Sequence, residues 1–162
     1  MELERLSDAG STLNQTSVTG TASSAGSVAF DNTGNVWVVG NANNDVYVYS
    51  HIGTTISSGF SGGGINTPTA IAIDGLGDAW IANGNGSISQ LASPSGAVTP
   101  STGYQSDTGL LKTPTGLIID NAGSVWVTNS GNNTVTKIIG VAAPVTTPTV
   151  TGTTNNTLGV RP

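Results

Sequence analysis

The chain has 162 residues and a formal net charge of −5, and only 8% of its residues are charged, against roughly 25% in an average soluble domain. Its four basic residues are scattered, so it lacks the Lys and Arg cluster on which nucleic-acid affinity depends and is a poor partner for an anionic membrane surface. Cysteine is absent, which excludes disulfides, thiolate nucleophiles and cysteine-based zinc sites.

Composition favours strands over helices. Ser, Thr, Asn and 23 Gly supply the polar character, and regularly spaced apolar residues with low charge indicate a folded, turn-rich domain rather than disorder. The excess of β-branched residues predicts an all-β fold. Residues 1–10 lack the apolar stretch of a signal peptide, and no apolar run approaches the length of a membrane span.

The chain opens on a segment that is similar to the end of a later repeat. Residues 3–6, followed by Gly10, resemble the strand and following glycine at residues 136–140. We therefore expect residues 1–26 to hold the outer strands of a preceding blade and the connection into the next one.

Three segments then repeat one pattern in the same register. Residues 27–40, 70–83 and 117–129 each combine a short apolar strand, an Asp-x-x-Gly turn and a second strand that carries a Trp. The repeated aspartates are 43 and 46 residues apart (31 to 74, and 74 to 120), which is the period of a four-stranded propeller blade. The matching residues are Asp31, Gly34 and Trp37, then Asp74, Gly77 and Trp80, then Asp120, Gly123 and Trp126.

Each repeat continues outward from its Trp strand. An Asn- and Gly-rich loop leads to an alternating third strand, at residues 46–49, 88–91 and 135–138, and this alternation indicates one more solvated side. A fourth strand is predicted at residues 54–57, 97–101 and 146–151. The expected blades are residues 27–66 (blade 1), 67–112 (blade 2) and 113–140 (the inner three strands of blade 3), with a Thr- and Pro-rich tail, 141–162, as a candidate to complete blade 3.

The repeated Trp and Asp residues have a functional and a structural interpretation. Trp rings could stack on sugars or bases, but their fixed place in every repeat favours a packing wedge between sheets. The carboxylates could bind a cation near the ring axis, but the glycine three residues later favours capping of the turn. No calcium-loop pattern occurs, and we predict no metal and no cofactor.

The best binding candidates are the Asn-rich loops between the second and third strands. Loops on a rigid scaffold commonly carry function, and Asn could bind a glycan or an extended peptide. Tight hairpins also require Asn and Gly, so both interpretations stay open. The candidate ligand-binding residues are Asn41, Asn43, Asn83, Asn85, Asn129, Asn132 and Asn133.

The pattern Pro-x5-Asp-x2-Gly-x2-Trp-x2-Asn resembles the NHL-repeat propellers and the related repeats of the streptogramin (virginiamycin B) lyases. Residues 114–139 and 68–91 carry it best, and residues 27–50 less fully. The resemblance implies a β-propeller with about three four-stranded antiparallel blades plus an outer half-blade, forming a partial ring. The ending, from residue 143, is similar to that of secreted bacterial NHL-repeat proteins, which implies an extracytoplasmic location, secreted or periplasmic, for a parent with an upstream signal.

The resemblance to the lyases implies a site with His, Glu and magnesium near the ring axis. Here the single histidine, His51, follows a third strand towards the rim, and the only glutamates are Glu2 and Glu4. No residue matches the catalytic positions, and no P-loop occurs. We therefore predict no catalytic residue in this chain.

These observations favour a non-catalytic NHL-type binding or scaffold module that displays its Asn-rich loops to a protein or a glycan. One alternative is a fragment of a lyase-like enzyme whose catalytic residues lie in missing blades, and another is a structural cell-surface repeat domain. Three blades do not close a ring, and closure is what removes exposed sheet edges. A symmetric homodimer would close a ring of six blades. Neither a nucleic-acid partner nor a membrane span is expected.

Overall fold

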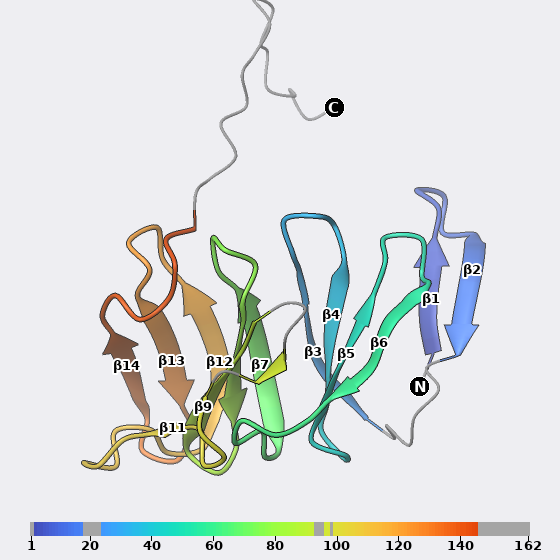
Figure 1. Ribbon diagram of the computed structural model, residues 1–162. Coiled ribbons are helices and arrows are strands. Elements are labelled where there is room, and N and C mark those ends of the chain that lie inside the picture. Colours follow the sequence, from blue (N-terminus) through green and yellow to red (C-terminus); the bar gives the residue numbers. More distant parts are fainter. Residues whose placement is uncertain (1, 18–23, 93–95, 98, 146–162) are drawn as a thin grey trace, which may run out of the picture.

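The computed structural model describes residues 2–17, 24–92, 96–97 and 99–145. These residues form antiparallel sheets and contain no helix (Figure 1), so none of them could cross a membrane as a helix. The first sheet pairs β1 (Glu2–Leu6) with β2 (Thr12–Ser17). We call this sheet the half-blade.

Three larger sheets follow in chain order. Blade 1 contains β3 (Ala25–Phe30), β4 (Val36–Gly40), β5 (Asp45–Tyr49) and β6 (Thr55–Phe60). Blade 2 contains β7 (Pro68–Ile73), β8 (Ala79–Asn83), β9 (Ser87–Ala92), β10 (Gly96–Ala97) and β11 (Tyr104–Gln105). Blade 3 contains β12 (Pro114–Ile119), β13 (Val125–Asn129) and β14 (Thr134–Ile138).

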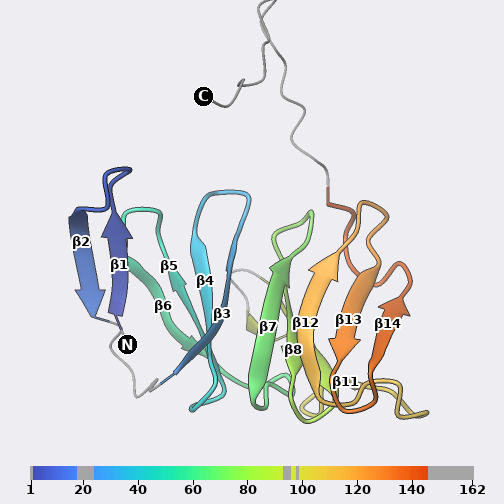
Figure 2. The same ribbon diagram turned by 180° about the vertical axis from the view of Figure 1, so that it is seen from behind.

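The blades stand side by side as an arc with their first strands adjacent. The first strand of blade 2, β7, contacts β3 on one side and β12 on the other. Figures 1 and 2 show the same succession of sheets from opposite sides, with the half-blade beside β5 and β6. The all-β architecture of about three blades and an outer half-blade is therefore confirmed.

Alternation along the second strands builds the cores between blades. In β4, Trp37 and Val39 point to one side and join a core cluster with Ile71 and Ile81 of blade 2. In β8, Trp80 and Ala82 point to the corresponding side and join a cluster with Val125 and Val127 of blade 3. The Trp-bearing face of one blade thus packs against the opposite face of the next blade.

The two ends of the arc lack this cover at several apolar residues. On β3 of blade 1, Val28 is 56% exposed and Phe30 is 67% exposed. On blade 3, Ile118 of β12 and Val135 of β14 share the Trp-bearing face and are 66% and 62% exposed. The homodimer that would cover these ends stays a prediction.

The fourth strand of blade 2 differs from its expected position. The sequence predicts one strand at residues 97–101, whereas the structure has two short strands, β10 and β11, that both pair with β9. Between them, the Thr99 hydroxyl donates a hydrogen bond of 2.6 Å to the Gly63 carbonyl oxygen near blade 1. This inter-blade contact takes Thr99 away from the ladder. The fourth strand predicted for blade 3, at residues 146–151, lies outside the described residues.

Candidate functional site

The Asp-x-x-Gly turns lie at one end of the blades, which we call the upper end (Figure 1). In blade 2, Oδ1 of Asp74 accepts hydrogen bonds from the backbone N–H groups of Leu76 and Asp78, both at 3.0 Å. Its Oδ2 accepts a hydrogen bond from Nε1 of Trp80 at 3.0 Å. The carboxylate therefore caps its own turn and also fixes the indole of the following strand.

The same Asp–Trp pair recurs in the other two blades. Trp37 donates to Asp31 at 3.0 Å, and Trp126 donates to Asp120 at 2.9 Å. Burial by itself would raise the pKa of Asp31, but hydrogen bonds from the turn and from Trp37 outweigh it and lower this pKa to about 2. The hydrogen bond from Trp126 is the main cause that lowers the pKa of Asp120 to about 2. Both carboxylates are therefore ionised at neutral pH.

The carboxylates of these aspartates accept hydrogen bonds from the protein and do not converge on a shared cation site. Oδ2 of Asp74 also accepts a hydrogen bond from the Ala143 N–H at 3.0 Å, and the Asn32 amide of blade 1 donates to the Gly75 carbonyl at 3.2 Å. These bonds join neighbouring turns along the upper rim. Within the part of the chain that the structure describes, no group of three His, Cys, Asp or Glu side chains is placed to hold a metal ion.

The three Trp rings are covered to different extents. Trp37 stacks on Phe60 with ring centroids 6.0 Å apart, and Trp80 stacks on Tyr104 at 6.2 Å. Both indoles are buried, being 1% and 2% exposed. Trp126, on the last blade, is only partly buried and has the Lys137 ammonium 4.7 Å from its ring centroid. The difference follows from position, because no described blade packs against the face that carries Trp126.

Loops at the lower end of the blades connect the second and third strands. Asn83, at the end of β8, is fully buried. Its Oδ1 accepts a hydrogen bond from the Asn66 N–H at 3.1 Å, and its Nδ2 donates to the hydroxyls of Ser87 and Ser89 at 3.1 and 2.9 Å. Asn83 thus fastens the connection between blades 1 and 2 to the loop of blade 2.

Asn129 makes the equivalent connection in blade 3. It is 2% exposed, its Oδ1 accepts from the Lys112 N–H at 3.2 Å, and its Nδ2 donates to the Thr136 hydroxyl at 3.0 Å. Because Asn83 and Asn129 are buried and bonded, their amides belong to the framework of the loops. Blade 1 has Gly40 at this position.

The remaining Asn candidates lie in the loops themselves. Oδ1 of Asn85 accepts hydrogen bonds from the N–H and the hydroxyl of Ser87 at 3.2 and 2.8 Å. Oδ1 of Asn132 accepts from the Thr134 hydroxyl at 2.7 Å. Asn133 has a φ of 55°, a left-handed conformation that Asn tolerates well. Asn85, Asn132 and Asn133 are all exposed.

The two Asn candidates of blade 1 are less exposed. Asn43 is partly buried and its side chain hydrogen-bonds Tyr47. Asn41 is also partly buried, and its Oδ1 is buried without a hydrogen-bond partner among the described residues. A Cβ atom on Gly26 would meet this oxygen at 2.2 Å, so Gly26 leaves room for the Asn41 amide.

The connections between blades carry backbone strain at the lower end. Thr67 and Thr113, each directly before a Pro, have φ values of 50° and 49°, a region that is costly for β-branched residues. The Thr113 carbonyl accepts hydrogen bonds from the N–H and the hydroxyl of Ser130, both at 3.1 Å. Asn44 likewise accepts from the Thr67 N–H at 2.6 Å. These bonds hold the strained connections against the loops.

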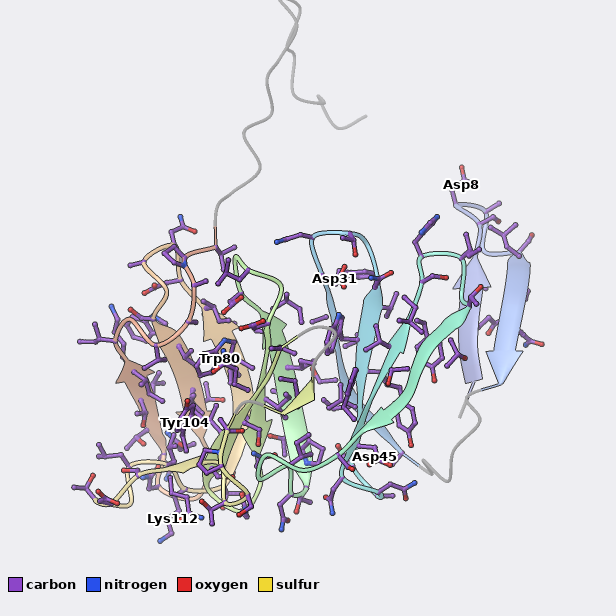
Figure 3. All side chains as sticks on the ribbon, viewed as in Figure 1. Asp8, Asp31, Asp45, Trp80, Tyr104 and Lys112 are labelled. Carbon is purple, nitrogen blue, oxygen red and sulfur yellow. The ribbon has the colours of Figure 1, made fainter. Side chains whose placement is uncertain are left out.

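A cavity of about 690 Å³ lies between blades 2 and 3, beside β14. Blade 2 contributes Trp80, Ile88 and Tyr104 to its wall, and Figure 3 labels Trp80 and Tyr104 on that side of the arc. The connection contributes Leu110 and Leu111, and β14 with the following turn contributes residues 136–139. The lining is mainly apolar, and its polar residues include Gln105, Ser106 and Thr136.

Comparison with known proteins identifies the fold but no family. No protein-family model matches the chain, and no curated protein matches its sequence. A streptogramin B lyase structure is similar with a TM-score of 0.72 and 17% identity, over 87% of this chain and 45% of that one. Virginiamycin B lyase from Staphylococcus aureus is similar with a TM-score of 0.67 and 15% identity, over 85% and 48%. The chain is a partial β-propeller.

A protein provisionally assigned as a gluconolactonase has the same fold, with a TM-score of 0.59 and 16% identity, over 89% of this chain and 47% of that one. The alignment with this chain therefore covers less than half the length of each of these three structures. At such low identity the likeness concerns the fold alone. The NHL-repeat resemblance stays an interpretation of the sequence.

Sequence reasoning missed three features of these sites. The hydrogen bond from the Trp indole to the Asp carboxylate has a signal, since Trp follows Asp by six residues in all three repeats. The buried role of Asn83 and Asn129 also has one, since each follows its Trp by three residues. The cavity has no such signal, because its walls come from three separated segments.

Proposed function

We propose that this partial propeller is a binding module that presents its lower loop face to a glycan or a protein. The lower loop face comprises residues 41–44, 84–86 and 130–133 with the adjoining connections 66–67 and 112–113. One observation carries the proposal: the buried amides of Asn83 and Asn129 fasten these loops to the connections between blades. A rigid loop loses little conformational entropy on binding.

The chemistry of this face suits a polar, weakly charged ligand. Asn85 and Asn132 use their Oδ1 atoms within the loops, and among the described residues no protein acceptor receives their Nδ2 groups. Asn133 and Lys112 are exposed beside them, and Figure 3 shows Lys112 at the lower end of the arc. Amide and ammonium donors complement the hydroxyl oxygens of a glycan or the carbonyl oxygens of a peptide.

The test changes the exposed amides without disturbing the loops. Asn85→Asp and Asn132→Asp keep the Oδ1 acceptor that each loop uses, and Asn133→Gly suits a positive φ. We expect the triple variant to bind at least about tenfold more weakly than the parent to any glycan selected on an immobilised panel. Its melting temperature should stay close to that of the parent.

A charge-matched control lies at the upper end. Asn121→Asp with Leu76→Asp adds the same two negative charges at exposed turn positions, so this variant should keep the affinity of the parent. Equal loss of binding in both variants, or unchanged binding in the triple variant, would show that the lower loop face is not the site.

The likeness to a streptogramin B lyase structure favours a second candidate, a fragment of a lyase-like enzyme. In this chain His51 is exposed beyond β5, and Glu4, in β1 of the half-blade, accepts a hydrogen bond from Thr12 at 2.5 Å. The catalytic residues would then lie in blades outside this chain. A structure of catalytically inactive virginiamycin B lyase contains quinupristin. Incubation of this chain alone with quinupristin, followed by mass spectrometry, should show no conversion. Conversion would show that the chain carries catalytic residues of its own and would contradict the binding module.

A further inference from the structure

The hairpin loop between β8 and β9 contains the Asn-Gly dipeptide twice in succession, as Asn83-Gly84 and Asn85-Gly86. In such a dipeptide the backbone nitrogen of the glycine can attack the asparagine side chain, because the glycine has no Cβ atom to hinder the approach. The two dipeptides share one loop, but their surroundings differ. Asn83 is fully buried, whereas Asn85 is exposed.

Hydrogen bonds hold the first dipeptide in an unreactive arrangement. The Asn83 amide makes three of them, including those that its Nδ2 donates to the hydroxyls of Ser87 and Ser89 at 3.1 and 2.9 Å. The Gly84 N–H donates to the Thr67 carbonyl at 2.9 Å. A reaction between Asn83 and Gly84 therefore requires local unfolding of the loop.

The Asn85 side chain is exposed and folds forward across the peptide bond that follows it. Its Oδ1 accepts hydrogen bonds from the N–H and the hydroxyl of Ser87 at 3.2 and 2.8 Å. Both donors point at the oxygen that gains negative charge when a nucleophile adds to Cγ, and donors placed in this way stabilise the transition state. Among the described residues no protein group accepts from Nδ2 of Asn85, the nitrogen that has to leave.

The fold requires glycine at position 86, so the second dipeptide is built into the hairpin. The φ of Gly86 is 90°, in the region that favours glycine, and a Cβ atom there would be 2.9 Å from the Leu111 carbonyl oxygen. The Gly86 N–H donates to the Asn83 carbonyl at 3.1 Å. This one turn hydrogen bond has to open before the nitrogen reacts, which costs less than opening the buried bonds of Asn83.

We propose that Asn85 is a site of spontaneous deamidation, in which water replaces the side-chain amide and ammonia is released. The Gly86 nitrogen loses its proton to hydroxide and forms a bond to Cγ of Asn85. The bond between Cγ and Nδ2 then breaks, ammonia leaves after taking a proton from water, and a cyclic succinimide remains. Water opens either of the two C–N bonds of this ring. The products are an ordinary aspartate and an isoaspartate, whose main chain runs through Cγ.

The reaction adds a negative charge to the lower loop face. The product at position 85 carries the same carboxylate as the Asn85→Asp change that tests the proposed function, so ligand binding should weaken as the protein ages. This consequence rests on the proposed function, whereas the reaction itself does not. The two are tested separately, because the reaction is followed by mass and needs no ligand.

Peptide mapping of the incubated full chain tests the proposal. After incubation of the folded protein at mildly alkaline pH, cleavage after Trp80 and Leu91 releases residues 81–91, a peptide that contains both asparagines. Fragment-ion masses then show which of them has become a carboxylic acid. We expect Asn85 to react at least about tenfold faster than Asn83, because Asn83 first has to leave its buried hydrogen bonds. The product should include isoaspartate, which direct hydrolysis of the amide does not give.

The denatured chain separates the effect of the structure from that of the sequence. In guanidinium chloride the two dipeptides lose their different surroundings, and their rates should lie within about threefold of each other. Equal rates in the folded protein would overturn the proposal. It would also be overturned if Asn85 of the folded protein were stable under conditions in which the same protein reacts once denatured, or if its product contained no isoaspartate.

Blade 3 offers a matched site that lacks the glycine. Asn132 is exposed and its Oδ1 accepts a hydrogen bond from the Thr134 hydroxyl at 2.7 Å, as Oδ1 of Asn85 does from Ser87. The next residue, Asn133, has a Cβ atom that hinders the attack, so Asn132 should be stable in the parent. Asn133→Gly, at a φ of 55°, should raise the deamidation rate of Asn132 by at least about tenfold. An unchanged rate at Asn132 would contradict the arrangement inferred for Asn85.

Discussion

The indole of Trp80 donates a hydrogen bond of 3.0 Å to Oδ2 of Asp74, and both side chains are 2% exposed. One buried contact therefore joins the turn at the upper end of blade 2 to the core between blades 2 and 3. The same pair in blade 3, Asp120 and Trp126, is more exposed. Differences between the repeats thus offer internal controls for most experiments on this fold.

Asp74→Asn should lower the free energy of unfolding by about 2–3 kcal/mol, since one amide oxygen cannot serve the four donors that the carboxylate serves and a buried bond to a charged group is lost. Asp120→Asn should lower the free energy of unfolding by less, because water reaches the carboxylate of Asp120. Urea denaturation measures both values. An equal loss in the two variants would mean that burial does not set the strength of the pair.

Acidification should destabilise the protein between about pH 4 and pH 2. The folded-state pKa values of Asp31 and Asp120 are lowered to about 2 from an ordinary value of 3.8. A lowered pKa contributes stability that is present above pH 3.8 and is lost as the pH falls through the folded pKa. Thermal melts across this range should decline less steeply for Asp31→Asn than for the parent.

The indoles of Trp80 and Trp126 should contribute differently to the free energy of unfolding. Trp80→Ala removes a buried ring that stacks on Tyr104 and should cost about 3–5 kcal/mol. Trp126→Ala should cost about half as much or less, because its ring is partly solvated and covered by Lys137. Denaturant titration of both variants measures the difference, and a larger loss for Trp126 would contradict the open face of blade 3.

Thr113→Gly should leave stability unchanged or raise it by up to about 1 kcal/mol. The φ of 49° at this position strains a β-branched residue, and glycine removes that strain while keeping the carbonyl that accepts from Ser130. The greater freedom of glycine in the unfolded chain offsets part of the gain. Val135→Gly, in β14 at a regularly paired strand position, is the control and should be destabilising when melting is measured.

The exposed apolar ends of the arc predict association into a homodimer. Light scattering over a wide concentration range should give twice the chain mass, and Ile118→Asp, on the Trp-bearing face of blade 3, should shift it to the monomer mass. Leu76→Asp, at an upper turn where Leu76 is 80% exposed, should have no such effect. A monomer mass for the parent at every concentration would refute the dimer.

Much of the architecture is encoded in short stretches of the chain. The Asp-x-x-Gly turn depends on atoms within four residues, because the carboxylate of Asp74 bonds the backbone of Leu76 and Asp78. Such local chemistry, repeated three times, predicts blades and their order from the sequence. The fourth strand of blade 2 escaped this reasoning, because Thr99 is bonded to Gly63, far away in the chain.

The sequence by itself determined the repeats, their turns and the alternation that directs Trp37, Trp80 and Trp126 to one face of each blade, since these depend on local backbone preference and side-chain period. Only the tertiary structure decided which of these rings is buried, which Asn amides are bonded inside the loops and where the cavity lies. Burial depends on the neighbouring blade. Asn83 and Asn129 are therefore enclosed while Asn85 and Asn132 meet solvent, although all four are the same residue type within three positions of one another at the lower ends of blades 2 and 3.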